Sequence, residues 1–180
     1  MDFSKYTGSI NFSNIKKFKT NDGKYCLIDY DSKHFHVELP HNIVAYDVDM
    51  SVNRPNVFVY LNDTKLSDFN DLIKKEIVNY VFNNSFSIYG TFKTVEELEQ
   101  CYSNPKKIKK NKNSFSNILK LKLANKNGLE QITRNSRVKM IVDISGVWFS
   151  DQSFGPYYDI IQLDVIPLEP SKCLFIDTDS

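Results

Sequence analysis

The chain has 180 residues and a mass of 20.9 kDa, which suits a single domain and leaves no room for a second of full size. Hydrophobic residues make up 41% of the chain and charged residues 25%, a composition that can bury a core and excludes wholesale disorder. We expect a soluble intracellular protein that does not bind membranes, because no apolar run reaches the roughly 18 residues of a membrane helix and the first residues lack a signal-peptide pattern.

The first half of the chain predicts short strands followed by one helix. Runs that alternate polar and apolar residues predict strands over 24–30, 34–39 and 56–61. An amphipathic helix is expected over about 67–82, where apolar side chains recur at helical spacing from Phe69 to Val81. Residues 85–93 alternate again, which predicts a further strand.

A short helix and a basic loop are expected in the middle of the chain. Thr94, followed three residues later by Glu97, is a capping-box pattern for a helix that ends before Pro105. The next segment, at about 104–114, holds five lysines between 106 and 112 and has no apolar period. We therefore expect it to be an exposed basic loop.

Three long strands are predicted in the last third, over 115–124, 137–149 and 157–167. Strands then outnumber helices, so we predict a mainly β protein with a few helices (α+β). Its architecture would be an OB-type small β-barrel with insertions, with residues 1–180 forming a single nucleic-acid-binding domain. A β-sandwich is the alternative, because periodicity does not determine which strands pair.

The net charge of +1 conceals a strong separation of charge along the chain. Residues 101–140 hold eleven basic residues and one acid, a net of +10, which leaves −9 for the remainder. This distribution favours a polyanion as partner; a solvated basic loop and self-association between oppositely charged faces are the alternatives. Lysines outnumber arginines by 20 to 3, which favours phosphate contacts over base-edge readout.

Aromatic residues gather near the basic strands, at Trp148, Phe149, Phe154, Tyr157 and Tyr158. Basic grooves with aromatic rings bind single strands, because bases stack on the rings at roughly 1 to 3 kcal/mol each, whereas a duplex hides its base faces. Unbroken alternation from Val138 places Phe149 outward and Trp148 toward the core, and a bulge at Gly146 would reverse both. On the last strand, alternation places Tyr158 outward and Ile161 inside.

The end of the chain resembles a known family. Three segments carry the resemblance: Ser145-Gly146-Val147-Trp148-Phe149, Ser153-Phe154-Gly155 and Tyr158-Asp159-Ile160-Ile161-Gln162. They resemble the closing strands of single-stranded DNA-binding proteins from large double-stranded DNA viruses, over about residues 145–165. The resemblance implies an OB-type fold, cooperative coating of replicating DNA, no enzymatic activity, and a location in the host cytoplasm or nucleus. The family's acidic C-terminal tail is represented here only by Asp177 and Asp179.

We therefore predict a sequence-tolerant single-stranded DNA-binding protein that coats and protects replication or recombination intermediates. RNA is a further candidate ligand, and molecules would associate with one another along the strand. No catalytic residue, metal or cofactor is assigned. The predicted nucleic-acid-binding residues are Lys106, Lys107, Lys109, Lys110, Lys112, Lys120, Lys122, Arg137, Lys139, Trp148, Phe149, Phe154 and Tyr158.

Two other functions are consistent with the sequence. The first is a structural or interaction protein whose basic face binds an acidic protein partner. The second is a metal-dependent nuclease, because His34 and His36 share one strand face and carboxylates lie nearby in sequence. That spacing is less specific than established zinc motifs, and the histidines fit a solvated face, opposite Phe35 and Val37, better than a metal site. The cysteines (Cys26, Cys101 and Cys173) are widely spaced, which predicts free thiols.

Overall fold

A computed structural model describes residues 9–19, 23–61, 64–110, 115–126 and 132–166. Its strands are β1 (Ile10–Phe12), β2 (Lys16–Lys17), β3 (Lys24–Tyr30), β4 (Lys33–His34), β5 (His36–Ile43), β6 (Asn56–Tyr60), β7 (Lys106–Lys110), β8 (Phe115–Leu123), β9 (Arg137–Phe149) and β10 (Phe154–Ile166). Its helices are α1 (Thr64–Asn83), α2 (Ser85–Tyr89) and α3 (Val95–Cys101). The prediction of a mainly β protein with a few helices is confirmed. Within the described residues, no helix is both long and apolar enough to cross a bilayer.

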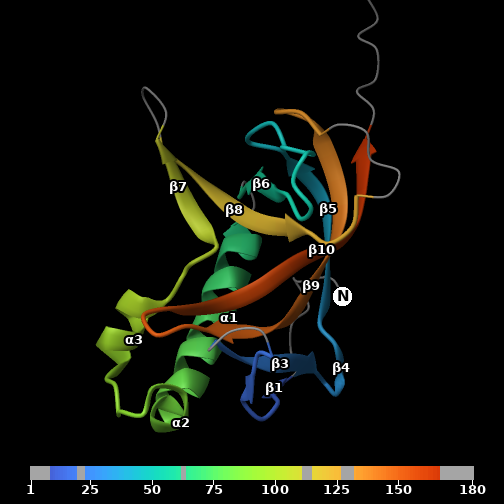
Figure 1. Cartoon of the computed structure of the whole chain (residues 1–180). Helices are drawn as coiled ribbons and strands as arrows, with labels where there is room; N and C mark the ends of the chain where they lie inside the picture. Colours follow the sequence, from blue (N-terminus) through green and yellow to red (C-terminus); the bar gives the residue numbers. More distant parts are fainter. Residues whose placement is uncertain (1–8, 20–22, 62–63, 111–114, 127–131, 167–180) are drawn as a thin grey trace, which may run out of the picture.

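The long hairpin of β9 and β10 is the centre of the sheet (Figure 1). The first half of β9 pairs with β5, from Arg137 to Asp143, and its last residues pair with β3. On the other side, β10 runs parallel to β8, which also pairs with β6 and β7. An isolated bridge between Val44 and Val59 joins the end of β5 to β6. These pairings curl the sheet into a half-barrel.

A bulge at Ser145 changes which residues of β9 are buried. Gly146 pairs with Tyr157, but the next pair along β10 is Ile144 with Tyr158, so Ser145 is an extra residue. Before the bulge the even-numbered residues are buried, and after it Val147 and Phe149 are buried instead. The prediction that Phe149 faces outward is therefore wrong: it is 3% exposed and belongs to the core.

The helix α1 packs its apolar face against the inner face of the sheet. Phe69, Ile73, Ile77 and Val81 recur at helical spacing, are all buried, and share one core cluster with β3, β5, β9 and β10. The helix begins at Thr64, earlier than the predicted start at about 67. Burial of this face, rather than intrinsic helix propensity, accounts for most of its stability.

The strand predicted over 85–93 is instead the short helix α2. Gly90 ends it in the left-handed conformation (φ 74°), and its N–H donates to the Phe86 carbonyl. The alternation that suggested a strand does not reflect burial, because Phe86 and Phe92 are 58% and 85% exposed and stack on each other. The capping box is confirmed: the Glu97 N–H donates to Thr94 Oγ1 at 3.2 Å, and the Thr94 N–H to Glu97 Oε2 at 2.7 Å.

Part of the segment predicted as a basic loop forms the edge strand β7. Its backbone pairs with β8 from Lys106↔Leu119 to Lys110↔Phe115, and residues 111–114 lie outside the described residues. An edge strand needs backbone partners on one side only, and lysines there discourage pairing with other chains. A segment without a regular spacing of apolar residues can therefore still form a strand at the edge of the sheet.

Candidate nucleic-acid interface

A groove of about 810 Å³ opens where β10 separates from β8. The two strands pair only at Asp159↔Lys122 and Ile160↔Leu123. Toward its start, β10 is instead held by the segment before β7, because the Ser103 N–H donates to the Phe154 carbonyl at 2.7 Å. The edge of β10 between these two contacts is left open, and it forms one side of the groove.

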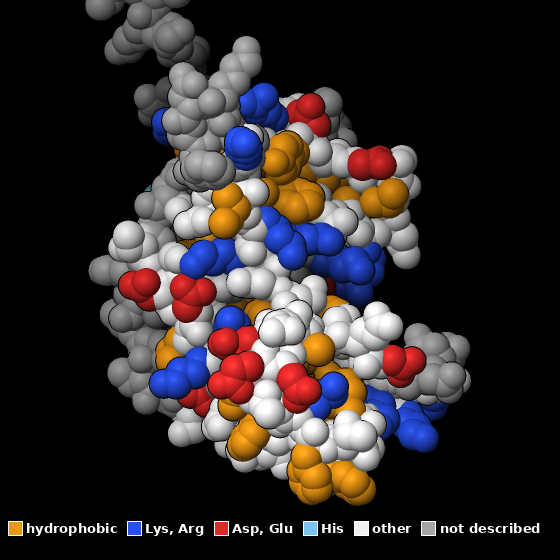
Figure 2. Space-filling model, turned by 90° about the vertical axis from the view of Figure 1, so that its left-hand side faces the viewer, with side chains coloured by type: hydrophobic (Ala, Val, Ile, Leu, Met, Phe, Trp, Pro, Cys, Tyr) orange, Lys and Arg blue, Asp and Glu red, His pale blue; other side chains and the backbone are white. Residues whose placement is uncertain are grey.

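Three exposed lysines line one wall of this groove: Lys107, Lys120 and Lys122. On β8, Lys120 and Lys122 alternate with buried Leu119, Leu121 and Leu123, so their side chains project from the outer face. Lys107 is paired across β7 and β8 with Ile118, which puts it on the same face as Lys120. Figure 2 shows the side of the molecule that carries β7, with a band of basic side chains across its middle and acidic side chains below.

Aromatic rings line the opposite part of the groove. Trp148 is half-buried on β9, between Tyr25 on β3 and Gly155 on β10. A Cβ atom at Gly155 would lie 3.2 Å from Cζ2 of the indole and 3.0 Å from the Ser103 carbonyl oxygen, so the glycine makes room for the ring. Phe18, also in the lining, stacks on Tyr25 with a ring-centroid distance of 4.8 Å.

Tyr157 adds a third half-buried ring, on β10. Burial raises the pKa of its hydroxyl, as does the nearby Asp159 carboxylate, while Arg54 acts in the opposite direction. The hydroxyl therefore keeps its proton at physiological pH. The ring is neutral and can stack on a base as an uncharged aromatic surface.

The groove also contains two acids, Asp151 and Asp159. The guanidinium of Arg54 donates to Asp159 Oδ1 at 2.7 Å, and this ion pair compensates the negative charge of the carboxylate. The lysine wall is therefore only partly offset by acids within the groove.

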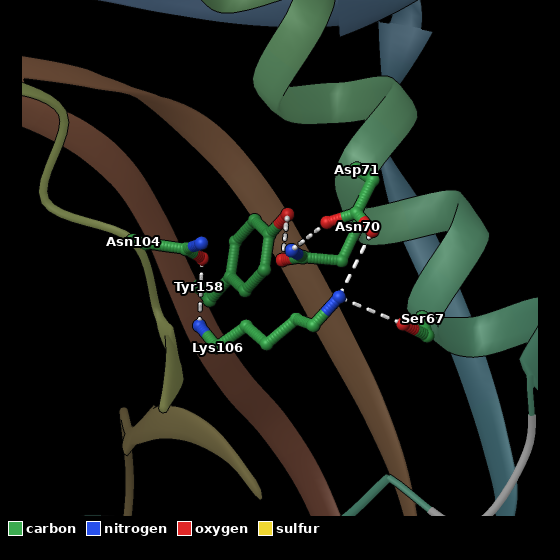
Figure 3. Close-up of polar contacts among 6 residues, drawn as sticks. All are labelled: Ser67, Asn70, Asp71, Asn104, Lys106 and Tyr158. Atoms are coloured by element: carbon green, nitrogen blue, oxygen red, sulfur yellow. Dashed lines mark hydrogen bonds and ion pairs between the residues drawn. The ribbon is translucent and has the colours of Figure 1, made fainter. Parts of the chain in front are cut away.

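Two predicted binding residues have structural roles instead (Figure 3). The Lys106 ammonium donates to Ser67 Oγ and to Asp71 Oδ2, both at 2.9 Å, and so anchors β7 to α1. Tyr158 is 6% exposed, and its hydroxyl donates to Asn70 Oδ1 on α1 at 3.4 Å. Burial raises the pKa of Tyr158 well above its ordinary value. Lys106 lies outside the groove lining, and Tyr158, although part of it, is buried with its hydroxyl directed to α1.

The remaining predicted residues divide into three groups. Phe149 and Phe154 are core residues with 3% and 0% exposure, so neither offers a ring face to a base. Arg137 and Lys139 lie on the first half of β9, away from the groove lining, and Lys139 pairs with Glu38 at 3.0 Å. Lys110 is exposed at the end of β7 and also lies outside the lining. The side chain of Lys109 and all of Lys112 lie outside what the structure describes.

Two aromatic residues of the groove, Phe18 and Tyr157, were not among the predicted binding residues, although Tyr157 belongs to the aromatic cluster seen in the sequence. Ile161 is an extra residue in the pairing of β10 with β9, so the alternation read back from the end of β10 wrongly placed Tyr158 outward and its neighbour Tyr157 inside. Phe18 comes from a distant part of the chain, and only the pairing of β3 with β9 brings it to the groove.

A family model matches residues 44–177, which include the groove's lysines, Trp148 and Tyr157. The chain belongs to DUF5871, a family of unknown function. No curated protein and no solved structure matches it. The family match begins after β5, so His34 and His36 precede it.

Proposed function

We propose that this protein binds single-stranded nucleic acid in the groove beside β10, with single-stranded DNA as its first ligand and little sequence preference. The observation that carries the proposal is the composition of the groove: Lys107, Lys120 and Lys122 lie on one wall, and Trp148, Tyr157 and Phe18 lie along the rest. Lysines that follow a phosphate backbone, with rings that stack on bases, are the features of sequence-tolerant single-strand binding.

In this arrangement the phosphates would lie against β7 and β8, and the bases would turn toward Trp148 and Tyr157. Each stacked base would contribute roughly 1 to 3 kcal/mol. Lysine contacts would make the affinity fall with salt, because each neutralised phosphate releases bound counterions. A duplex would gain the phosphate contacts only, since its bases already stack on one another.

The strand order lends the proposal further support. Five strands, β5, β6, β8, β9 and β10, follow one another around the curled sheet, and the isolated bridge between Val44 and Val59 links the first to the second. In chain order the third of these (β8) and the fifth (β10) are the one parallel pair of neighbours among them. OB barrels, which bind oligonucleotides, have the same strand order and the same parallel pair. The likeness is confined to the strands, because α1 lies between the second and third of these strands, whereas OB barrels carry their helix between the third and fourth.

The test is fluorescence anisotropy of labelled single-stranded and duplex oligonucleotides of equal length, titrated with protein at two salt concentrations. We expect tighter binding of the single strand and a loss of affinity at higher salt. The double variant Lys120→Glu with Lys122→Glu should weaken binding at least tenfold on every sequence, since it reverses two charges in the groove.

The matched control is Lys33→Glu with Lys75→Glu, which makes the same change of net charge at exposed positions outside the groove. This control should bind almost as well as the unchanged protein. Equal weakening by both double variants would mean that the groove has no special role. Equal binding of duplex and single strand, or no binding, would favour a protein whose basic face contacts duplex or an acidic protein partner.

A further inference from the structure

Two histidines and an aspartate lie close together on the outer face of the sheet, on β4, β5 and β9. Phe35 is 1% exposed and buried in the core, so its neighbours His34 and His36 project from the opposite face. Asp143 on β9 is the cross-strand partner of His36. The two imidazole rings are nearly parallel, with a centroid distance of 5.5 Å and an interplanar angle of 9°.

The polar atoms of these three side chains are close together. One nitrogen from each imidazole and one carboxylate oxygen all lie within 4.8 Å of one another. His36 Nε2 is 3.6 Å from Asp143 Oδ1, a distance too long for a hydrogen bond. Among the described residues, Asp143 Oδ1 is buried and has no hydrogen-bond partner. The His36 imidazole is the only basic group within ion-pair distance of this oxygen in the described part of the chain. A buried carboxylate oxygen without a hydrogen bond, facing two imidazoles, is an arrangement that a bound cation would satisfy.

We propose that His34, His36 and Asp143 bind a divalent transition-metal ion, with Zn²⁺ as the best chemical match. Imidazole and carboxylate together suit Zn²⁺, Co²⁺ and Ni²⁺, whereas Mg²⁺ and Ca²⁺ prefer oxygen ligands alone. Ligand atoms around a bound zinc ion lie about 3.3 Å apart, so the side chains must draw closer than they are here. His34 is exposed and can rotate to do so. Three protein ligands leave a coordination position for water or an external ligand.

The test is the binding of Zn²⁺ to the full chain after treatment with a chelator, measured by isothermal titration calorimetry. The visible absorption of added Co²⁺ gives a second, spectroscopic measurement. We expect one equivalent of metal, bound in the micromolar range or more tightly. His34→Ala should weaken binding roughly tenfold or more, and Asp143→Asn should do the same.

The chain's third histidine, His41, supplies the matched control, because it is exposed on β5 and lies outside the cluster. His41→Ala should bind metal as the unchanged protein does. Loss of binding in His41→Ala, or full binding in His34→Ala with His36→Ala, would assign the metal to other ligands and overturn the proposal. A lack of metal binding by the unchanged protein would overturn it as well. His34 is exposed, so its variant is expected to fold, and circular dichroism verifies this. The outcome does not depend on whether the groove binds nucleic acid.

Discussion

Gly155 and Trp148 act together at one end of the groove. The glycine has no side chain where the indole lies, and its cross-strand position opposite Trp148 keeps the ring half-buried, with one part of its surface open to the groove. A fully buried tryptophan could not stack on a base, and a fully exposed one would lose much of its rotational freedom on binding. In the proposed complex, the half-buried ring would lose little rotational freedom when a base stacks on it.

Trp148 is the only tryptophan, so its fluorescence reports on the groove alone. We expect a single-stranded oligonucleotide to quench this emission in a saturable way, and a duplex of equal length to quench it much less, because duplex bases are not free to stack. Trp148→Leu should weaken single-strand binding by roughly 1 to 3 kcal/mol. Tyr46→Leu, a partly exposed ring outside the groove lining, is the control. Binding without quenching would place the bases elsewhere.

At the scale of elements, local sequence patterns predicted the positions of strands and helix caps better than they predicted which strand residues face the core. The strand over 137–149 and the capping box at Thr94 follow from neighbouring residues, and both are confirmed. The predicted inward and outward positions are wrong after Ser145 and again near Ile161, where the register between β9 and β10 shifts. Each extra residue there reverses the alternation of buried and exposed side chains. Ile161, expected inside, is 42% exposed.

The candidate site was only partly predictable for a related reason. Lys120, Lys122 and Trp148 could be named because charge and aromatic content are visible locally. The groove itself depends on how far β8 and β10 stay together, and the histidine cluster depends on the pairing of β5 with β9. Neither pairing can be read from periodicity, and the partner of His36 and His34 lies more than a hundred residues away at Asp143.

The close approach of β3 and β9 explains the glycine beside the bulge. A Cβ atom at Gly146 would lie 2.3 Å from the Cys26 carbonyl oxygen, which is backbone and cannot rotate away. We expect Gly146→Ala to lower the free energy of unfolding by about 1 to 3 kcal/mol, because the strands must separate. Ser145→Ala, at the adjacent partly exposed position, should change it by about 0.5 kcal/mol at most. Urea denaturation measures both, and equal effects would refute the steric explanation.

At the scale of the whole molecule, the basic residues of segment 101–140 that the structure describes do not form one continuous patch. Lys106 is paired with Asp71, Lys139 with Glu38, and the Lys126 ammonium donates to the Met50 and Val52 carbonyls. These lysines tie separate elements together. The charge that remains in the groove comes from Lys107, Lys120 and Lys122. Counting charges along the sequence therefore overstates the binding surface.

Buried groups that lose a proton at high pH should make the fold sensitive to alkali. Burial raises the pKa of the Cys26 thiol from 9.0 to about 11, despite opposing hydrogen bonds from Val147 and Tyr80. Burial likewise raises the pKa of Tyr80 from 10.0 to about 12. The unfolded chain releases these protons first, so the stability they contribute is complete below pH 9 and is lost as pH rises toward the folded values.

We therefore expect the free energy of unfolding to fall between pH 9 and pH 11, by at most about 1.4 kcal/mol per pH unit for each titrating group. Urea denaturation under reducing conditions measures this slope. Cys26→Ala should make it shallower between pH 9 and 10. A slope that is the same in Cys26→Ala would assign the alkaline sensitivity to the tyrosines alone.

The separation of β10 from β8 also sets a length. The free edge runs from Phe154 to Asp159, which at about 3.4 Å per residue is roughly 17 Å. A strand whose nucleotides stack at a spacing of about 3.4 Å would place roughly five nucleotides along this length. A strand with a more extended backbone would place fewer. If the groove holds a single strand, each molecule has a small footprint. Coverage of a long strand would then be governed by how many copies are present, with one 20.9 kDa chain required for every few nucleotides.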